Sequence, residues 1–487
     1  MKHTGNIKKI GRMLAERRVS CTELTKAYLS AIEKENEKLT AYVNVTPETA
    51  LEAAALVDEK IAKGESLRPL EGIPMTLKDN ISTKGIETTC CSKILKGYVP
   101  IYNASVWETL RGQNAVLLGK TNMDEFAMGS SCETSCFGGA KNPHDTGRVA
   151  GGSSGGVAAA VAGNLAVFGL GSDTGGSIRE PASFCGLVGL KPTYGAVSRY
   201  GLVAYASSFD QIGPIAASVE DAALIFDAIS GKDERDSTSC GRAQTVCPSL
   251  EKDIRGKKIG IAEEYFDGIR EDVKTAVEKA ASVFESLGAE LVRFRMPSIH
   301  YCLPVYYILT CAEASSNLGR YDGIRFGYQT EHYADRDEMV RRTRSEGFGA
   351  EVKRRILLGT YVLSAGYYDA YYKKAQNLRG ALIRDFDEAF GQCDAMLAPT
   401  VPITSFPCNS EHSSVETYRT DICTVPVNIA GLPAVSVPCG FGSDGLPVGM
   451  QLIGNRFSEH VILNLARQYE LAAGDSVFRA VPMGVQL

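Results

Sequence analysis

The sequence predicts an α/β fold built on a largely parallel or mixed β-sheet. Apolar strand-like segments at 258–262 and 289–294 flank an amphipathic helical segment at 271–287, which Gly288 ends. This strand–helix–strand alternation is typical of α/β proteins. Neither an internal repeat nor a shift in composition divides the chain, so we expect a single domain over residues 1–487.

Composition excludes several classes of protein. With 44% hydrophobic and 22% charged residues, the chain has the composition of a soluble globular protein. A net charge of −5 argues against binding to nucleic acid through a broad basic face of its own. The N-terminus lacks the apolar stretch of a signal peptide, and Asn164 interrupts the longest small-residue apolar run, so we expect a cytoplasmic protein without a membrane span.

The fourteen cysteines are expected to be reduced. Many lie in apolar or tightly turned contexts, where a thiol packs as a small hydrophobic group in a reducing compartment. The chain has no CxxC pair, and its six histidines are scattered singly. We therefore predict no metal site.

The N-terminal part, about residues 1–66, is predicted to be a helical subregion. The capping box Ser20-Cys-Thr-Glu23 begins one helix, and Thr46-Pro47 caps a second helix that Gly64 ends. Further along, a long helical region is expected over 350–390, followed by short strands and a closing helix.

A lysine interrupts the short apolar run at 70–81, which reads LEGIPMTLKDNI. Within such a strand, Lys78 must be paired, extend to solvent or serve a function. If Lys78 is buried, desolvation lowers its pKa and makes the neutral amine available as a base near pH 7. A second strand at 115–119 is followed by Lys120-Thr121, but the spacing of glycines before this GKT excludes a Walker A phosphate loop.

Two Gly/Ser clusters, at 151–156 and 175–177, flank the small-residue apolar run 157–171. One such cluster alone is equally consistent with a flexible linker. Two clusters beside a segment that must pack in a core favour turns with a function, because glycine lets backbone N–H groups approach a ligand closely. Such turns can present a nucleophilic hydroxyl and an oxyanion-binding site.

The sequence at 152–156 also matches GxSxG, which raises the alternative of a Ser-His-Asp hydrolase with Ser154 as nucleophile and His460 as base. A nucleophile elbow follows a core strand directly, whereas residues 142–148 are polar and turn-like. This disfavours the histidine alternative and leaves Lys78 as the better base.

Three motifs together resemble the amidase-signature family of Ser-cisSer-Lys hydrolases. They are GIPMTLKDN at 72–80, GGSSGG at 151–156 and GSDTGGSIREPAS at 171–183. Their spacing also matches, with 75 residues from Lys78 to Ser153 and 24 from Ser153 to Ser177. The resemblance implies a large mixed β-sheet covered on both sides by helices.

This resemblance also implies the roles of individual residues. Ser177 is the expected nucleophile, Lys78 the base, and Ser153, after a cis peptide bond from Gly152, the group that passes the proton between them. Ser154 is expected to support them by hydrogen bonding. The expected oxyanion donors are the backbone N–H groups of Thr174, Gly175, Gly176 and Ser177. Beside the nucleophile, Asp173 and Arg179 are interpreted as an ion pair that braces the loop.

Longer segments are similar to one branch of this family, the A subunits of bacterial aspartyl/glutamyl-tRNA amidotransferases. They lie at 122–131, 306–327, 347–361 and 421–440. The resemblance implies a glutamine site formed by Tyr306, Arg355 and Asp421, although the adjacent Tyr307 and Arg354 leave a one-residue shift open. Arginine suits an α-carboxylate and aspartate an α-ammonium group. Without the resemblance, core packing for Tyr306 and a surface charge for Arg355 are the simpler interpretations.

The function implied is glutamine hydrolysis through an acyl-enzyme, with the ammonia used to amidate Glu-tRNA(Gln), Asp-tRNA(Asn) or both. The implied partners are the B and C subunits of a heterotrimer, with the mischarged tRNA reached through the complex. ATP and Mg are expected in a partner subunit, and no cofactor in this chain. Two alternatives remain: a stand-alone amidase for small amides, and a partner-binding protein with a decayed site, which the intact Lys78, Ser153 and Ser177 disfavour.

Overall fold

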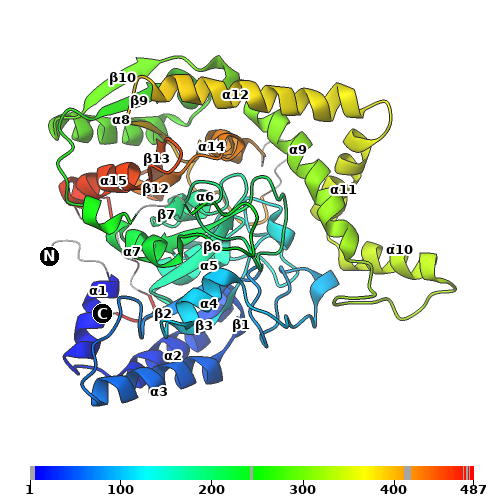
Figure 1. Cartoon of the computed structure of the whole chain (residues 1–487), viewed down its shortest axis with the longest axis horizontal. Helices are drawn as coiled ribbons and strands as arrows, with labels where there is room; N and C mark the ends of the chain where they lie inside the picture. The colour runs from blue at the N-terminus through cyan, green and yellow to red at the C-terminus, as the bar shows by residue number, and fades with distance from the viewer. Residues whose placement is uncertain are drawn as a thin grey trace.

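Eleven strands of the described chain form one mixed β-sheet through the centre of the molecule (Figure 1). The computed structural model describes residues 6–241, 245–410, 418–474, 477–478, 481 and 483–486. The strand order is β1-β3-β2-β6-β8-β7-β12-β13-β11-β9-β10. The predicted α/β fold with a large mixed sheet is confirmed.

The strands of this sheet are mostly short. Their bounds are β1 Tyr42–Val45, β2 Pro74–Lys78, β3 Val116–Thr121, β6 Phe168–Asp173, β7 Val188–Lys191, β8 Gln211–Ala216, β9 Lys258–Ala262, β10 Glu290–Phe294, β11 Ala395–Pro399, β12 Ala434–Phe441 and β13 Pro447–Gly454. Strand β2 is parallel to both β3 and β6, and β9 is parallel to β10 and β11. The other pairs are antiparallel, and β4 (Lys141–Asn142) and β5 (Asp145–Val149) form a separate hairpin.

Helices cover both faces of the sheet. Their bounds are α1 Asn6–Ala15, α2 Cys21–Leu39, α3 Pro47–Ala62, α4 Ser105–Arg111, α5 Gly155–Ala162, α6 Arg179–Phe184, α7 Val219–Ile229, α8 Glu271–Ser286, α9 Cys302–Asn317, α10 Arg336–Gly347, α11 Ala350–Leu363, α12 Lys374–Phe390, α14 Val425–Ala430 and α15 Glu459–Ala473. In β13, Gly449 lies against Ser183 of α6, whereas Gly454 lies against Ile462 of α15. Since side chains alternate along a strand, α6 and α15 lie on opposite faces.

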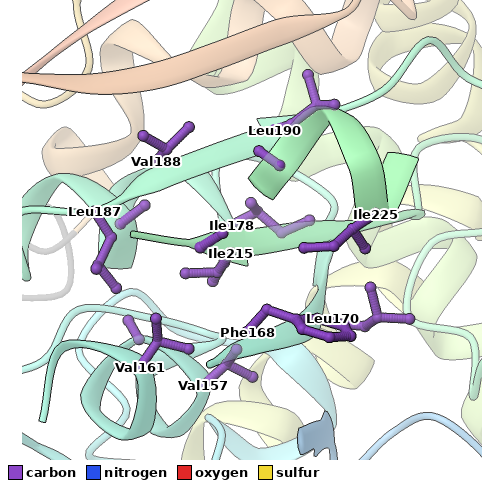
Figure 2. Close-up of a cluster of buried hydrophobic side chains, with 14 of the residues drawn as sticks. Val157, Val161, Phe168, Leu170, Ile178, Leu187, Val188, Leu190, Ile215 and Ile225 are labelled. Atoms are coloured by element: carbon purple, nitrogen blue, oxygen red, sulfur yellow. The ribbon is translucent and has the colours of Figure 1, made fainter. Parts of the chain in front are cut away.

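The small-residue run of the sequence packs α5 tightly against β6 (Figure 2). A Cβ atom at Gly169 of β6 would lie 2.5 Å from Cγ1 of Val157 in α5. Every residue of α5 is buried. Phe168 and Leu170 alternate with Gly169 and are fully buried. This close packing fixes the start of α5, next to Ser153, relative to the end of β6.

The N-terminal helices are present, with differences in detail. The capping box at Ser20 is confirmed, and α2 continues to Leu39. Thr46 does not cap α3 with its side chain, since its hydroxyl donates to the carbonyl of Leu117 instead. Strand β1 lies between α2 and α3 and pairs with β3, so the subregion is not purely helical. Residues 1–5 of it lie outside the described residues.

Two further sequence predictions have different outcomes. The unit at 258–294 is confirmed as β9, α8 and β10, with the two strands parallel. The helical region over 350–390 is present but interrupted, because α11 ends at Leu363 and a π-helical turn, Tyr368–Lys373, precedes α12. No helix of the described chain is both long enough and apolar enough to cross a membrane.

Candidate active site

The candidate site lies where two neighbouring parallel strands end. Lys78 is the last residue of β2, and Asp173 is the last residue of β6. Because parallel strands end at the same edge of a sheet, Lys78 lies close to the loop that follows Asp173. That loop contains Ser177, and α5 begins at this edge just after Ser153.

Lys78 is fully buried and bound to the predicted relay serine. Its Nζ donates to Ser153 Oγ at 2.7 Å and to Oγ and the carbonyl of Ser172 at 3.0 and 3.2 Å. Burial lowers the pKa of Lys78 to about 8, although nearby carboxylates, chiefly Asp124, oppose the shift. The amine is therefore accessible in its neutral form close to neutral pH, as a general base requires.

The peptide bond between Gly152 and Ser153 is cis. Asp124 lies against this bond: its N–H donates to the carbonyl of Ser153 at 3.3 Å, and a Cβ at Gly152 would lie 2.0 Å from Oδ2 of Asp124. The N–H of Ser154 donates to the carbonyl of Ser177 at 3.1 Å, so the two Gly/Ser clusters lie side by side. The hydroxyl of Ser154 donates to the carbonyl of Ser172.

Four backbone amides of the nucleophile loop, residues 174–177, were predicted oxyanion donors. The N–H of Gly176 donates to Oδ1 of Asp173 at 2.8 Å and is already occupied. Within the described chain, no protein acceptor is bonded to the N–H groups of Thr174, Gly175 or Ser177. The structure therefore leaves these three amides open to an oxyanion, and Gly176 would have to share its hydrogen.

The nucleophile loop tolerates no side chain at its two glycines. A Cβ at Gly175 would lie 2.6 Å from Cζ of Tyr306, and one at Gly176 would lie 2.3 Å from Oγ1 of Thr424. The hydroxyl of Thr424 also donates to the carbonyl of Gly175 at 2.6 Å. Gly176 has a φ of 142°, which glycine adopts readily. Tyr306 and Thr424 thus pack directly against the loop.

Asp173 and Arg179 form the expected ion pair under this loop. Both side chains are fully buried, with Nε of Arg179 3.1 Å from Oδ2 of Asp173. Arg179 also donates to the side chains of Gln451 and Asn428. Although burial alone would raise the pKa of Asp173, Arg179 lowers it to about 2.

Replacing Arg179 with alanine is expected to lower the free energy of unfolding by about 3–5 kcal/mol, because Asp173 would remain as an unpaired buried charge. In the wild type, the ionised Asp173 carboxylate contributes to the free energy of unfolding. This contribution is complete above about pH 4 and is lost as the pH falls toward 2, since the pKa of Asp173 in the folded state lies below the usual value. Urea unfolding of the variant checks this. The exposed Arg341→Ala variant is the control and should change stability by about 0.5 kcal/mol or less. An equally stable Arg179→Ala variant contradicts the prediction.

An aromatic and charged cluster lies beside the nucleophile loop. The hydroxyl of Tyr307 donates to Oδ2 of Asp421 at 3.0 Å, and the guanidinium of Arg355 lies 5.3 Å from the ring centroid of Tyr307. Arg355 donates through Nε to Glu351 and through Nη1 to Tyr205 at 2.8 and 2.7 Å. Its Nη2 has no acceptor in the described part of the chain. One edge of the guanidinium therefore remains for an anion.

This cluster bears on the one-residue alternatives. Arg355 is buried, whereas the side chain of Arg354 is 54% exposed and bound to Glu351 on the surface of α11. The geometry therefore favours Arg355. Tyr306 and Tyr307 both lie in this cluster: Tyr306 packs on Gly175, and Tyr307 donates a hydrogen bond to Asp421. The structure therefore does not separate these two alternatives.

Comparison with known proteins identifies the family. Residues 23–463 match the amidase family. This chain belongs to that family. It is 55% identical over 469 residues to the A subunit of glutamyl-tRNA(Gln) amidotransferase from Caldanaerobacter subterraneus subsp. tengcongensis, covering 96% of each sequence. It is also 55% identical to the protein of the same name from Carboxydothermus hydrogenoformans, covering 95% of this chain and 96% of the relative.

Solved structures agree with this assignment. The amidase is similar to the crystal structure of the glutamyl-tRNA(Gln) amidotransferase A subunit from Thermotoga maritima, with a TM-score of 0.80 and 41% identity over 96% of this chain and 95% of the other. A bacterial aryl acylamidase of the amidase signature family gives a TM-score of 0.86 at 24% identity, which shows the shared fold alone.

Some residues of the amidase site escaped sequence reasoning. Ser172 binds Lys78 and also accepts from the side chain of Asn80 at 2.9 Å. Asp124 and Thr424 contact the two Gly/Ser clusters, and Tyr205 contacts Arg355, all from distant parts of the chain. Only Ser172 had a local signal, its place directly before Asp173 in the GSD motif.

The rejected motifs lie elsewhere in the amidase. His460 lies on α15, where Glu459, Lys252 and Lys257 are its charged neighbours, and no bond in the described chain joins it to Ser154. Lys120 of the GKT sequence is buried and donates to the carbonyl of Ile81 at 2.7 Å. Neither arrangement supports a histidine-dependent hydrolase or a phosphate loop.

Proposed function

We propose that this amidase is the glutamine-hydrolysing component of a tRNA-dependent amidotransferase. The observation that carries the proposal is the pair of opposite charges beside the nucleophile loop, with Arg355 and Asp421 both next to the ring of Tyr307. An α-carboxylate suits the open edge of Arg355, and an α-ammonium group suits Asp421. Glutamine has both groups as well as a side-chain amide, whereas a simple amide has neither.

The proposed reaction begins with attack of Ser177 Oγ on the side-chain amide carbon of glutamine. The Ser177 proton passes to Ser153, whose own proton passes to the neutral amine of Lys78, in line with the 2.7 Å contact between the last two groups. Open amides of the nucleophile loop bind the oxyanion. The C–N bond then breaks as Ser153 returns a proton to the leaving nitrogen, and ammonia departs. Water hydrolyses the remaining glutamyl ester by the same relay, releasing glutamate.

The ammonia is proposed to serve the amidation of Glu-tRNA(Gln), Asp-tRNA(Asn) or both in a cytoplasmic heterotrimer with the B and C subunits. The similar proteins that are named as A subunits of glutamyl-tRNA(Gln) amidotransferase support this part of the proposal. ATP and Mg would be bound by a partner subunit, and the tRNA would be held through the complex. The net charge of −5 is consistent with a chain that does not hold tRNA alone.

Co-expression with candidate partner subunits tests the proposal. The purified complex should convert Glu-tRNA(Gln) to Gln-tRNA(Gln) with glutamine and ATP, and a Ser177→Ala complex should do so only when free ammonia is supplied. Robust turnover of simple amides by the isolated chain, with no preference for glutamine and no effect of partners, would instead support a stand-alone amidase.

A further inference from the structure

A buried carboxyl group that the proposed mechanism does not use lies three residues after the nucleophile. Glu180 of α6 has no exposed surface. Neither of its carboxylate oxygens has a well-aligned hydrogen-bond partner in the described residues. An ionised carboxylate in that state would be costly, so this group must be neutral or must serve a neighbour.

The neighbour is Asp421. Arg179, next to Glu180 in α6, donates to the carbonyl of Thr424, which directly follows the 3-10 helix Thr420–Cys423. This contact brings α6 beside that segment, where Asp421 and Thr420 are neighbours of Glu180 and Asp124 is the next carboxylate. Burial, followed by repulsion from Asp421, raises the pKa of Glu180 well above its usual range. No basic side chain lies among these neighbours, so burial and repulsion both favour the protonated form of Glu180.

Asp421 is the member of the pair that ionises more readily. It is partly exposed, whereas Glu180 lies fully inside the protein. Burial raises the pKa of Asp421 to about 7 and Asp173 adds to the rise, while Tyr307, Arg355 and the neighbouring Glu180 oppose it. The protonation state of Glu180 therefore affects the pKa of Asp421, and the reverse also holds.

We propose that Glu180 is a positioning residue for substrate recognition: as a protonated acid behind Asp421, it donates a hydrogen bond that holds the Asp421 carboxylate toward the α-ammonium group of the amide substrate. This inference rests on the proposed glutaminase function. Two hydroxyl donors, from Tyr307 and Glu180, then orient one carboxylate, and its outer side remains for the cation.

The consequence is a selective effect on binding. Losing a donor to a charged group typically weakens the state that depends on it by about 10- to 100-fold. The loss should appear as a higher KM for glutamine with little change in kcat, because the α-ammonium group is distant from the bond that breaks. Glutaramate, the analogue of glutamine without the α-amino group, should not be affected.

The test compares Glu180→Leu with Glu180→Gln in the complete complex, using glutamine and glutaramate. Leucine removes the donor, so the KM for glutamine should rise about 10-fold or more. In both proteins the KM for glutamine should increase as the pH falls and Asp421 becomes protonated. In Glu180→Leu this increase should begin at a higher pH than in the wild type, because Asp421 loses a group that favours its charged form. In Glu180→Gln, the side-chain amide still donates a hydrogen bond, so the KM for the substrate glutamine should stay within about threefold of the wild-type value.

Each outcome decides the matter. A leucine variant with the wild-type KM and pH profile, or a glutamine variant as impaired as the leucine variant, overturns the role of Glu180. If leucine prevents folding, as judged by thermal melting, Glu180→Met replaces it under the same criteria. A wild-type complex that does not prefer glutamine to glutaramate would refute the proposed glutaminase function itself, whatever the variants do.

Discussion

Alanine at position 177 is expected to abolish amide hydrolysis, with kcat falling about 10⁴- to 10⁶-fold. The nucleophile loop has two hydroxyl groups, and Thr174 donates its own to Asp210 at 2.7 Å. Ser177 is the other, and its carbonyl accepts from the N–H of Ser154, next to the relay serine. Without Oγ there is no atom to form the glutamyl ester. Glutamate release from glutamine and covalent labelling by a fluorophosphonate probe measure the loss.

The matched control is Ser183→Ala. Ser183 is also a buried serine, in α6, and its hydroxyl has no partner among the described residues. Its removal should leave kcat within about twofold of the wild-type value, because no buried donor or acceptor loses a partner. Probe labelling that persists in Ser177→Ala would place the nucleophile elsewhere.

The proposed catalytic residues have local signals in the sequence. Lys78 interrupts an apolar strand, and the glycines around Ser153 and Ser177 mark turns that approach other groups closely. The structure places these three residues together at one edge of the sheet, because β2 and β6 are parallel neighbours. Strand and helix periodicity was also sufficient for the unit at 258–294, in which α8 buries one apolar face.

The rest of the site depends on contacts between distant segments, which local patterns do not encode. Tyr205 binds Arg355 across 150 residues of sequence. By contrast, the interruption after Leu363 did have a local signal in Gly366, whose φ is 89°. Glutamate is a residue type common on helix surfaces, and the packing of α6 on the rest of the protein buries Glu180.

Replacing Lys78 with methionine is expected to lower kcat/KM by more than the roughly 10²- to 10⁴-fold that loss of a general base causes, because it also removes the group that fixes Ser153 and Ser172. In the wild type, kcat/KM for glutaramate should rise with pH through about 8, as the amine of Lys78 loses its proton. Using glutaramate keeps the titration of Asp421 out of the profile. Initial rates between pH 6 and 10 measure both effects.

The buried Lys120 provides the contrasting variant. Lys78 bonds neutral hydroxyl and carbonyl groups, and burial opposes its charge, so Lys78→Met should lower the melting temperature less than Lys120→Met does. Lys120 lies 3.5 Å from the buried carboxylate of Asp79, so Lys120→Met should lower the melting temperature. At temperatures where this variant is folded, Ser177 should still react with the probe. If Lys78→Met keeps a near-native rate, or loses activity only in proportion to lost folded protein, Lys78 is not the base.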